Sequence, residues 1–353
     1  MNTQSNVRRG KAQTVLQLIH AADLGPTLSH DHLVIDTRWL FKEPSEASLK
    51  SLAHQKIGLQ NLGWINYNWT SNADNCSVLE EDTAIAEVMR FVGAGGRTIV
   101  DPTNIGLGRD PHSLAKISRL TGANIIMGAG YYLEKTLPPE LADRSQEAIT
   151  EEIIRDIEIG VGDTGIRAGL IGEIGCSYPM TDVERRSLRA SVDAQRQTGA
   201  PLMVHPGRDP KSPFEIVEVV RRAGGDLSRM VICHIDRTCT DRGWLAELAA
   251  TGCYLEYDLF GNETSYYCQN PKVDMPSDAQ RMDIVLWHFE QGLEKQLLIS
   301  HDIATKTRLS RYGGLGYDHI LTNIVPRLRI RGLKEEGIRR LLIDNPAAAF
   351  SFA

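Results

Sequence analysis

Residues 169–208 read GLIGEIGCSYPMTDVERRSLRASVDAQRQTGAPLMVHPGR. The stretch opens with an apolar run that ends at Glu173 and closes with a second apolar run that ends at His205. Between them, the capping box TDVE at 181–184 predicts a helix that continues to residue 198 and stops at Gly199. Continuous rather than alternating apolar runs are typical of parallel strands buried on both faces. The stretch therefore predicts a strand–helix–strand unit of a parallel sheet.

The same alternation continues along the whole chain. Apolar runs that predict strands lie at 33–35 (with a histidine pair just before it), 98–101, 124–127, 169–173, 201–205, 230–234, 254–258 and 296–302. Amphipathic patterns that predict helices lie at 80–93, 110–121, 145–159, 181–198, 213–224, 241–252, 278–292 and 334–343. This repetition predicts a (β/α)8 TIM barrel, an α/β fold, as a single domain over residues 1–353. The rival is a doubly wound open sheet, but the nearest glycine-rich loop, at 106–108, lacks the GxGxxG spacing.

Two stretches are longer than a bare barrel needs. Residues 38–80, rich in Trp and Asn, follow the first predicted strand, and residues 260–278 follow the seventh. Long loops that follow barrel strands lie on the catalytic face and usually shape the substrate pocket. We therefore expect both stretches to contribute to specificity.

Composition excludes several classes of function. The chain has 353 residues and a net charge of -6, with no basic stripe, so a nucleic-acid partner is not expected. The N-terminus lacks the apolar segment of a secretory signal, and no run of about 18 apolar residues could span a membrane. Six cysteines occur without CxxC spacing, which predicts reduced thiols in a cytoplasmic protein. A homodimer is left open.

Six side chains with metal-ligating chemistry lie at corresponding places along the predicted barrel. His30 and His32 are separated by one residue, so both face the same side of an extended segment, with Asp31 facing away. Alone, this pair fits a surface or core pair as well as a metal site. Four further groups end other predicted strands, and the ends of barrel strands meet at one mouth. They are Glu173, His205, His234 and Asp302. Buried carboxylates and imidazoles are costly unless paired or bound to metal, so the set favours a metal centre.

The order of these motifs resembles a known family. HxH, GEIG, VH, HxD and HD occur on the predicted strands 1, 4, 5, 6 and 8. This pattern resembles the phosphotriesterase family of the amidohydrolase superfamily over essentially the whole chain. Segments such as CHIDRT at 233–238 and GCYLEYDLFG at 252–261 are similar to its phosphotriesterase-related group.

The resemblance implies a centre of two divalent metal ions, for which zinc is the expected identity. His30, His32 and Asp302 would hold the more buried ion. His205 and His234 would hold the more exposed one.

Glu173 and a hydroxide would bridge the two ions, where the bacterial phosphotriesterases have a carboxylated lysine. The resemblance then implies that the hydroxide is the nucleophile and that Asp302 is the catalytic residue that moves its proton to the leaving group.

The implied reaction is the hydrolysis of N-acetyltaurine and related small N-acyl amino acids to a carboxylate and a free amine. A lactonase, esterase or phosphotriesterase with the same metals is the alternative, and a catalytically idle binding barrel is a third. A small anionic N-acyl substrate needs a cation in the pocket. The candidates are Arg208, Arg237, Lys306 and Arg308, with Arg208 and Arg237 preferred.

Each preferred arginine has an equally plausible structural role, because Asp209 and Asp236 lie next to them in sequence and could pair with them. Four side chains follow or end predicted strands and are expected to line the substrate pocket: Tyr131, Tyr132, Tyr257 and Asp258.

Overall fold

The computed structural model describes residues 7–353 and contains an eight-stranded parallel sheet. Its strands pair in the spatial order β12-β11-β10-β9-β8-β7-β6-β3. Their bounds are β3 (Thr27–Leu28), β6 (Thr98–Asp101), β7 (Asn124–Ala129), β8 (Leu170–Gly175), β9 (Leu202–His205), β10 (Met230–Ile232), β11 (Tyr254–Tyr257) and β12 (Leu297–Ile299). Each barrel strand pairs with the barrel strand that follows it in the sequence, as expected when each strand is followed by a crossover helix.

Hydrogen bonds beyond the ends of β3 and β12 join the two edges of the sheet. The Ser29 hydroxyl donates to the Ile299 carbonyl at 3.0 Å, and the His30 amide donates to the Ser300 hydroxyl at 2.9 Å. The Asp302 amide then donates to the His30 carbonyl at 3.0 Å. The sheet is therefore a (β/α)8 barrel, and the predicted fold is confirmed.

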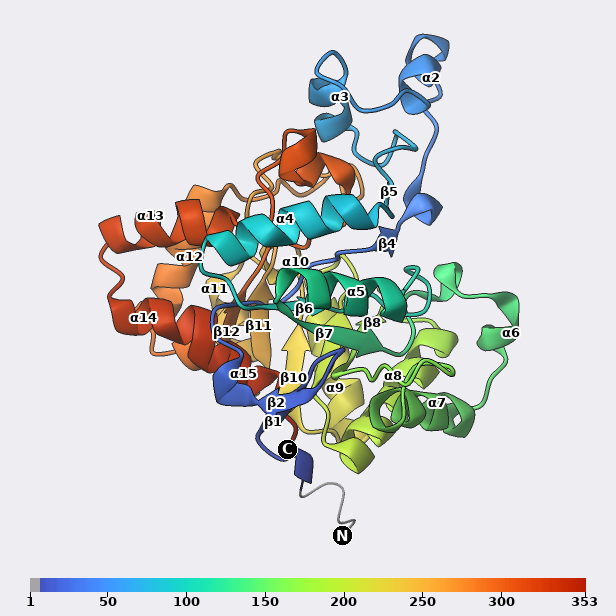
Figure 1. The fold of residues 1–353 in the computed structure, drawn as a ribbon, viewed down its shortest axis with the longest axis vertical. Helices are drawn as coiled ribbons and strands as arrows, with labels where there is room; N and C mark the ends of the chain where they lie inside the picture. Colours follow the sequence, from blue (N-terminus) through green and yellow to red (C-terminus); the bar gives the residue numbers. More distant parts are fainter. Residues whose placement is uncertain (1–6) are drawn as a thin grey trace.

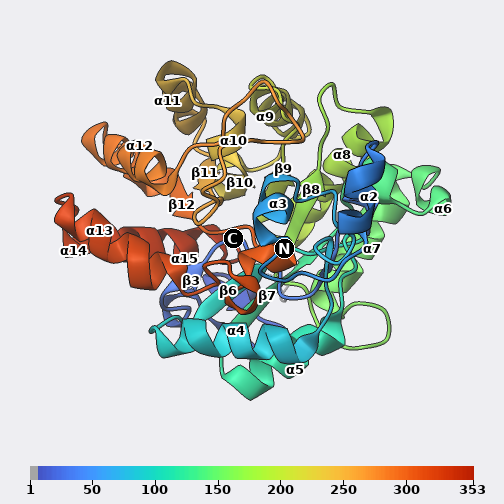
Figure 2. The ribbon, with the colours of Figure 1, turned by 90° about the horizontal axis from the view of Figure 1, so that it is seen from above.

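Helices surround the barrel, as the view along its axis shows (Figure 2). The main ones are α4 (Glu81–Gly93), α5 (Pro111–Thr121), α7 (Gln146–Glu158), α8 (Asp182–Thr198), α9 (Ser212–Arg222), α11 (Arg242–Ala250), α12 (Asp278–Glu290), α13 (Val325–Ile330), α14 (Glu335–Arg339) and α15 (Asn345–Ala349). The predicted capping box is present at the start of α8, where the Thr181 hydroxyl accepts from the Glu184 amide. Gly199 ends this helix with φ of 71°, a conformation that glycine adopts without strain.

The first barrel strand is not where the sequence pattern places it. Residues 33–35 do not form the predicted strand of the barrel. The barrel strand is Thr27–Leu28, and His30 and His32 follow it. Ile35–Asp36 is β4, which pairs with β5 (Ser77–Val78) in a separate two-stranded antiparallel sheet. The histidine pair therefore lies beyond the carboxyl end of its strand, as the barrel architecture requires of site residues.

The long stretch after the first strand stands above the barrel. It carries α2 (Ala47–Ala53) and α3 (Leu62–Tyr67), which project at the end opposite the chain termini (Figure 1). The ring of Tyr67 stacks on that of Tyr266, from the loop after β11, with centroids 4.5 Å apart. Trp69 packs on a buried cluster of Leu259, Tyr267 and Met275. The two long loops thus contact each other over the mouth of the barrel.

The thiols and the helices agree with the expectations from composition. All six cysteines are free, and five are buried. Burial raises the pKa of the Cys76 thiol to about 12, which leaves it protonated and unreactive at neutral pH. Among residues 7–353, no helix is both long and apolar enough to cross a bilayer.

Candidate functional site

The carboxyl ends of the strands bring the six predicted metal-ligating side chains together. Five of them are almost completely buried, while the side chain of Asp302 is 19% exposed. His234 lies two residues after the end of β10 and Asp302 three residues after the end of β12, and their φ values are 53° and 51°. Residues other than glycine rarely adopt this left-handed conformation, and such strain concentrates at functional sites.

Glu173 lies between two pairs of histidines. Its Oε1 atom is 3.7 Å from Nε2 of His30 and 3.6 Å from Nε2 of His32. Its Oε2 atom is 2.9 Å from Nδ1 of His205 and 3.3 Å from Nε2 of His234. One carboxylate oxygen therefore faces each pair.

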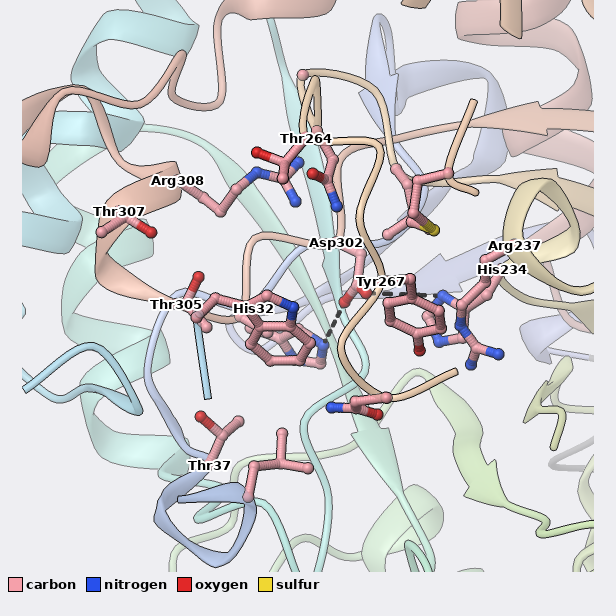
Figure 3. A pocket seen from close by; sticks show the side chains of 18 of the residues that line it. His32, Thr37, His234, Arg237, Thr264, Tyr267, Asp302, Thr305, Thr307 and Arg308 are labelled. Atoms are coloured by element: carbon pink, nitrogen blue, oxygen red, sulfur yellow. Dashed lines mark ion pairs between the residues drawn. The ribbon is translucent and has the colours of Figure 1, made fainter. Parts of the chain in front are cut away.

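Asp302 completes the group around the first pair. Its Oδ1 atom is 3.6 Å from Nε2 of His30 and 3.3 Å from Nε2 of His32. Its other oxygen, Oδ2, is 3.6 Å from Nδ1 of His234. Figure 3 shows Asp302 between His32 and His234, joined to each by a dashed line. Asp302 is thus oriented towards both the His30–His32 pair and His234.

Groups behind the site fix how the first histidines are oriented. Nδ1 of His30 lies 3.1 Å from Glu256 and 3.2 Å from Asp258. Nδ1 of His32 lies 2.8 Å from the Thr103 hydroxyl. When each Nδ1 carries the proton and donates it to these oxygens, the Nε2 lone pairs point into the site.

His234 is held in the same way, because its Nδ1 lies 2.8 Å from Asp258. Burial acts to raise the pKa of Asp258, but His234 and His30 overcome this and hold that pKa well below its usual range. A charged Asp258 accepts from Nδ1 of His234 and so directs Nε2 towards Glu173.

His205 directs Nδ1, rather than Nε2, towards Glu173 and His234. Its Nδ1 atom is 2.8 Å from Nε2 of His234, and its Nε2 atom is 3.3 Å from the Tyr132 hydroxyl. Burial lowers the pKa of His205 well below its ordinary value, so the imidazole is neutral at neutral pH, as a metal ligand must be.

The donor set fits a metal centre. Nε2 of His30 is buried and has no hydrogen-bond partner among residues 7–353. Nitrogen and carboxylate atoms of His30, His32 and Asp302 lie within 4.8 Å of one another, and so do those of His30, Glu173 and His234. Imidazole and carboxylate ligands in such a group suit zinc and similar divalent ions.

Asp31 faces away from the site, as the alternation of the HxH motif predicts. Its carboxylate accepts from the Ser300 hydroxyl at 3.0 Å and from the Ile303 amide at 3.0 Å, and lies 3.1 Å from Nδ1 of His301. Asp31 therefore ties the HxH segment to the strand end that carries Asp302.

A cavity of about 390 Å³ opens over five of the six side chains, namely His32, Glu173, His205, His234 and Asp302. Part of its wall is apolar, and part carries Arg208, Arg237 and Arg308. The apolar lining includes Ile35, Trp39, Leu40 and Leu107. The lining thus includes apolar side chains that suit an apolar group and cationic side chains that suit an anion.

The predicted cations differ in whether they are already paired. Lys306 is not free, because its ammonium lies 3.1 Å from Asp74 and 2.6 Å from Glu80. Asp236, the expected alternative partner of Arg237, instead pairs with Arg281 at 2.8 Å.

The three cavity arginines form no ion pair with a carboxylate in the described part of the chain. Nε of Arg208 donates to the Tyr267 hydroxyl at 2.7 Å. Arg237 donates to the Pro206 carbonyl at 3.3 Å, and Arg308 donates to the Phe260 carbonyl at 2.9 Å. Their charge is therefore available to a bound anion.

Of the two tyrosines preferred as substrate-binding residues, one lines the cavity and the other does not. Tyr132 lines the cavity, and its ring lies edge-on to His205 with centroids 4.9 Å apart. Tyr257 does not line it: its hydroxyl contacts Nε2 of His288 in α12 at 2.9 Å. The expectation that Tyr257 binds substrate is therefore wrong. Side chains alternate along β11, so Glu256 and Asp258 face the site while Tyr257 faces outward.

The contact between Tyr257 and His288 gives a prediction for stability. Burial lowers the pKa of His288 to about 4, whereas a histidine in an unfolded chain titrates near 6.5. Between these pH values the unfolded chain binds the proton and the folded chain does not, so stability falls as pH drops. At pH 4 the loss reaches about 3 kcal/mol. The free energy of unfolding, measured in urea at several pH values, should fall by about 3 kcal/mol less between neutral pH and pH 4 in His288→Gln than in the wild-type protein. The same pH dependence in both proteins would contradict the role of His288.

Glu256 is a functional position that the sequence reasoning missed, and Asp258, expected to line the pocket, lies behind the histidines instead. Both are fully buried and contact His30, and Asp258 also contacts His234. A signal was present in the sequence, because charged residues alternate with apolar ones in the otherwise apolar run 254–258. Two inward-facing carboxylates in a buried strand need cationic or hydrogen-bonding partners.

Comparisons with known proteins agree with this geometry. The model of the phosphotriesterase family matches residues 10–350. The chain is 46% identical to a phosphotriesterase-related protein of Nematostella vectensis, over 97% of this chain and 99% of that protein. It is 43% identical to an N-acetyltaurine hydrolase of Bos taurus, over 97% of this chain and 98% of that protein.

Solved structures show the same fold. A resiniferatoxin-binding protein from Rhodobacter sphaeroides is similar with a TM-score of 0.94 and 38% identity, covering 98% of this chain and 96% of that one. The lactonase Lmo2620 from Listeria monocytogenes has a TM-score of 0.79 and 25% identity, covering 97% and 99%. The family match and the full-length relatives together show that the chain belongs to the phosphotriesterase family, a family of hydrolases.

Proposed function

We propose that the protein is a hydrolase with two divalent metal ions, expected to be zinc. This proposal rests on the position of Glu173, whose two carboxylate oxygens face different pairs of histidines. His30, His32 and Asp302 would hold one ion. His205 and His234 would hold the other, and Glu173 would be shared between them.

The chain's own groups then divide the work of hydrolysis. When bound, two divalent ions supply an activated water near neutral pH and polarise the scissile carbonyl. Asp302 is the most exposed of the six side chains, and its Oδ2 atom is oriented towards His234 rather than towards the HxH pair. This carboxylate accepts the proton of the attacking water and returns it to the nitrogen of the departing amine. Tyr132 and Trp39, whose rings lie 5.9 Å apart, line the same cavity.

The substrate class that we propose is N-acetyltaurine and related small N-acyl amino acids. Support comes from full-length relatives named N-acetyltaurine hydrolase and from the unpaired arginines of the cavity. The anionic amine half would lie against Arg208 and Arg237, and the acyl group against the apolar wall. Guanidinium groups suit sulfonate and carboxylate because they donate two parallel hydrogen bonds.

Replacing Arg208 by alanine should raise KM for N-acetyltaurine by about 10- to 100-fold, because a charge-assisted hydrogen bond contributes about 1.5–3 kcal/mol. The KM for N-ethylacetamide, which lacks the sulfonate, should change much less. Steady-state kinetics with both substrates measure this, and Arg221→Ala on the exposed face of α9 serves as the control. Equal effects on the two substrates would exclude Arg208 from the anion site.

The proposed substrate class is tested by a parallel assay of the metal-loaded protein. N-acetyltaurine, a lactone and an aryl phosphotriester are compared by kcat/KM, and a chelator should abolish each activity. We expect N-acetyltaurine to be the best of the three. Lactone hydrolysis is the second candidate, because the similar Listeria protein is a lactonase. A higher kcat/KM for the lactone or the phosphotriester would refute the amide assignment.

A further inference from the structure

The amide of Gln269 is a polar group that the proposed reaction does not yet use. Gln269 lies in the loop between β11 and α12 and lines the cavity. Its Nε2 atom is buried and has no hydrogen-bond partner among residues 7–353. Buried amide donors are almost always satisfied in folded proteins, so an unpaired one on a residue that lines a cavity points to an acceptor on the ligand.

Contacts on both sides of Gln269 hold it next to Arg208. The Tyr267 hydroxyl accepts from Nε of Arg208 at 2.7 Å. The Asn270 side-chain amide donates to the carbonyl of Arg208 at 3.3 Å. Tyr267 and Asn270 thus contact the side chain and the main chain of Arg208, and Gln269 lies between them in the loop that forms this part of the cavity wall.

This wall offers hydrogen-bond donors from three separate side chains. The terminal guanidinium nitrogens of Arg208 have no partner among the residues that the structure describes. Tyr267 accepts from Arg208, so its own hydroxyl hydrogen remains available. Gln269 adds its unpaired Nε2. Within residues 7–353 no carboxylate forms an ion pair with Arg208, so the group fits an anion that accepts in three directions.

We propose that Gln269 is a specificity-determining residue that makes the cavity favour a sulfonate over a carboxylate on the amine half of the substrate. The proposal rests on the proposed hydrolysis of anionic N-acyl amines. A tetrahedral sulfonate has three oxygens pointing in different directions, one for each of Arg208, Tyr267 and Gln269. A planar carboxylate has two oxygens, which the arginine fork satisfies, and it leaves another donor unpaired. A binding site discriminates strongly against a ligand that leaves one of the site's buried donors without a partner.

The test uses two substrates that differ only in the anion. N-acetyltaurine and N-acetyl-β-alanine have the same acyl group and the same two-carbon spacer. The ratio of their kcat/KM values is measured for the full-length metal-loaded protein and for Gln269→Leu. We expect the wild-type protein to favour the sulfonate. In Gln269→Leu the ratio of the two kcat/KM values should fall about tenfold, mainly because KM for N-acetyltaurine rises.

Gln291→Leu at the exposed end of α12 is the matched control and should keep the wild-type ratio. Gln269→Met, which keeps an unbranched chain of similar length, replaces the leucine variant if that variant does not fold. An unchanged ratio, or an equal loss with both substrates, would overturn the role of Gln269.

A binding measurement separates this inference from the proposed function. Calorimetric titration with the same two compounds compares the wild-type protein with Gln269→Leu whether or not turnover occurs. If the wild-type protein hydrolyses neither compound, the proposed function fails. The inference fails if the substitution leaves the ratio of the two dissociation constants unchanged, and it is supported if that ratio falls about tenfold.

Discussion

Glu173→Gln is expected to reduce the bound metal to at most one ion per chain and to lower kcat/KM for N-acetyltaurine by about 1000-fold or more. The reason is electrostatic, because a neutral amide cannot place a negative oxygen against each histidine pair. In the wild-type site, Oε2 of Glu173 lies 2.9 Å from Nδ1 of His205 and Oε1 lies 3.6 Å from Nε2 of His32. Elemental analysis and steady-state kinetics on the same preparation measure both effects.

The matched control for this substitution is Glu290→Gln, at the exposed end of α12. It should bind metal and turn over substrate as the wild-type protein does. A Glu173→Gln protein that keeps two ions and full activity would show that the carboxylate is not shared between them.

Asp302→Asn is expected to lower kcat for N-acetyltaurine by about 100- to 10,000-fold, the range for a lost general acid–base group. Asparagine keeps an oxygen towards the HxH pair but cannot take up a proton. The loss should be smaller with p-nitrophenyl acetate, because nitrophenolate leaves without protonation whereas an amine does not. Comparing kcat for the two substrates therefore separates proton transfer from metal binding.

Asp344→Asn is the control, since Asp344 is partly exposed and pairs with the surface residue Arg339. If Asp302→Asn lowers the amide and ester activities equally, Asp302 does not protonate the leaving group.

The barrel could be predicted from sequence because its signals are local. Capping boxes, glycine stops and continuous apolar runs recur with each unit, and each such signal acts within a few residues. The first strand was misplaced because pairing is not local. Thr27–Leu28 is too short to stand out, and the apolar run at 33–35 contributes Ile35 to pairing with Val78 in a small separate sheet.

The candidate site, like the fold, has parts that could be predicted from the sequence and parts that could not. The structure groups the six predicted metal-ligating side chains, because strand ends are inferable once the barrel is recognised. The partners of the loop cations were not inferable: Lys306 meets Asp74 from more than 200 residues away, and only the folded chain shows this. Tyr257 was misassigned although the alternation of β11 gave its direction. The unpaired amide of Gln269 has no sequence signal, because it depends on what the folded loop leaves unsatisfied.

The number of metal ions per chain tests the account most directly. Wild-type protein, stripped with a chelator and reconstituted with increasing zinc, is measured by elemental analysis alongside its activity on N-acetyltaurine. The geometry around Glu173 predicts saturation at two ions per chain, with activity reaching its maximum only as the second ion binds. Saturation at one ion, or activity that survives complete removal of metal, would contradict it.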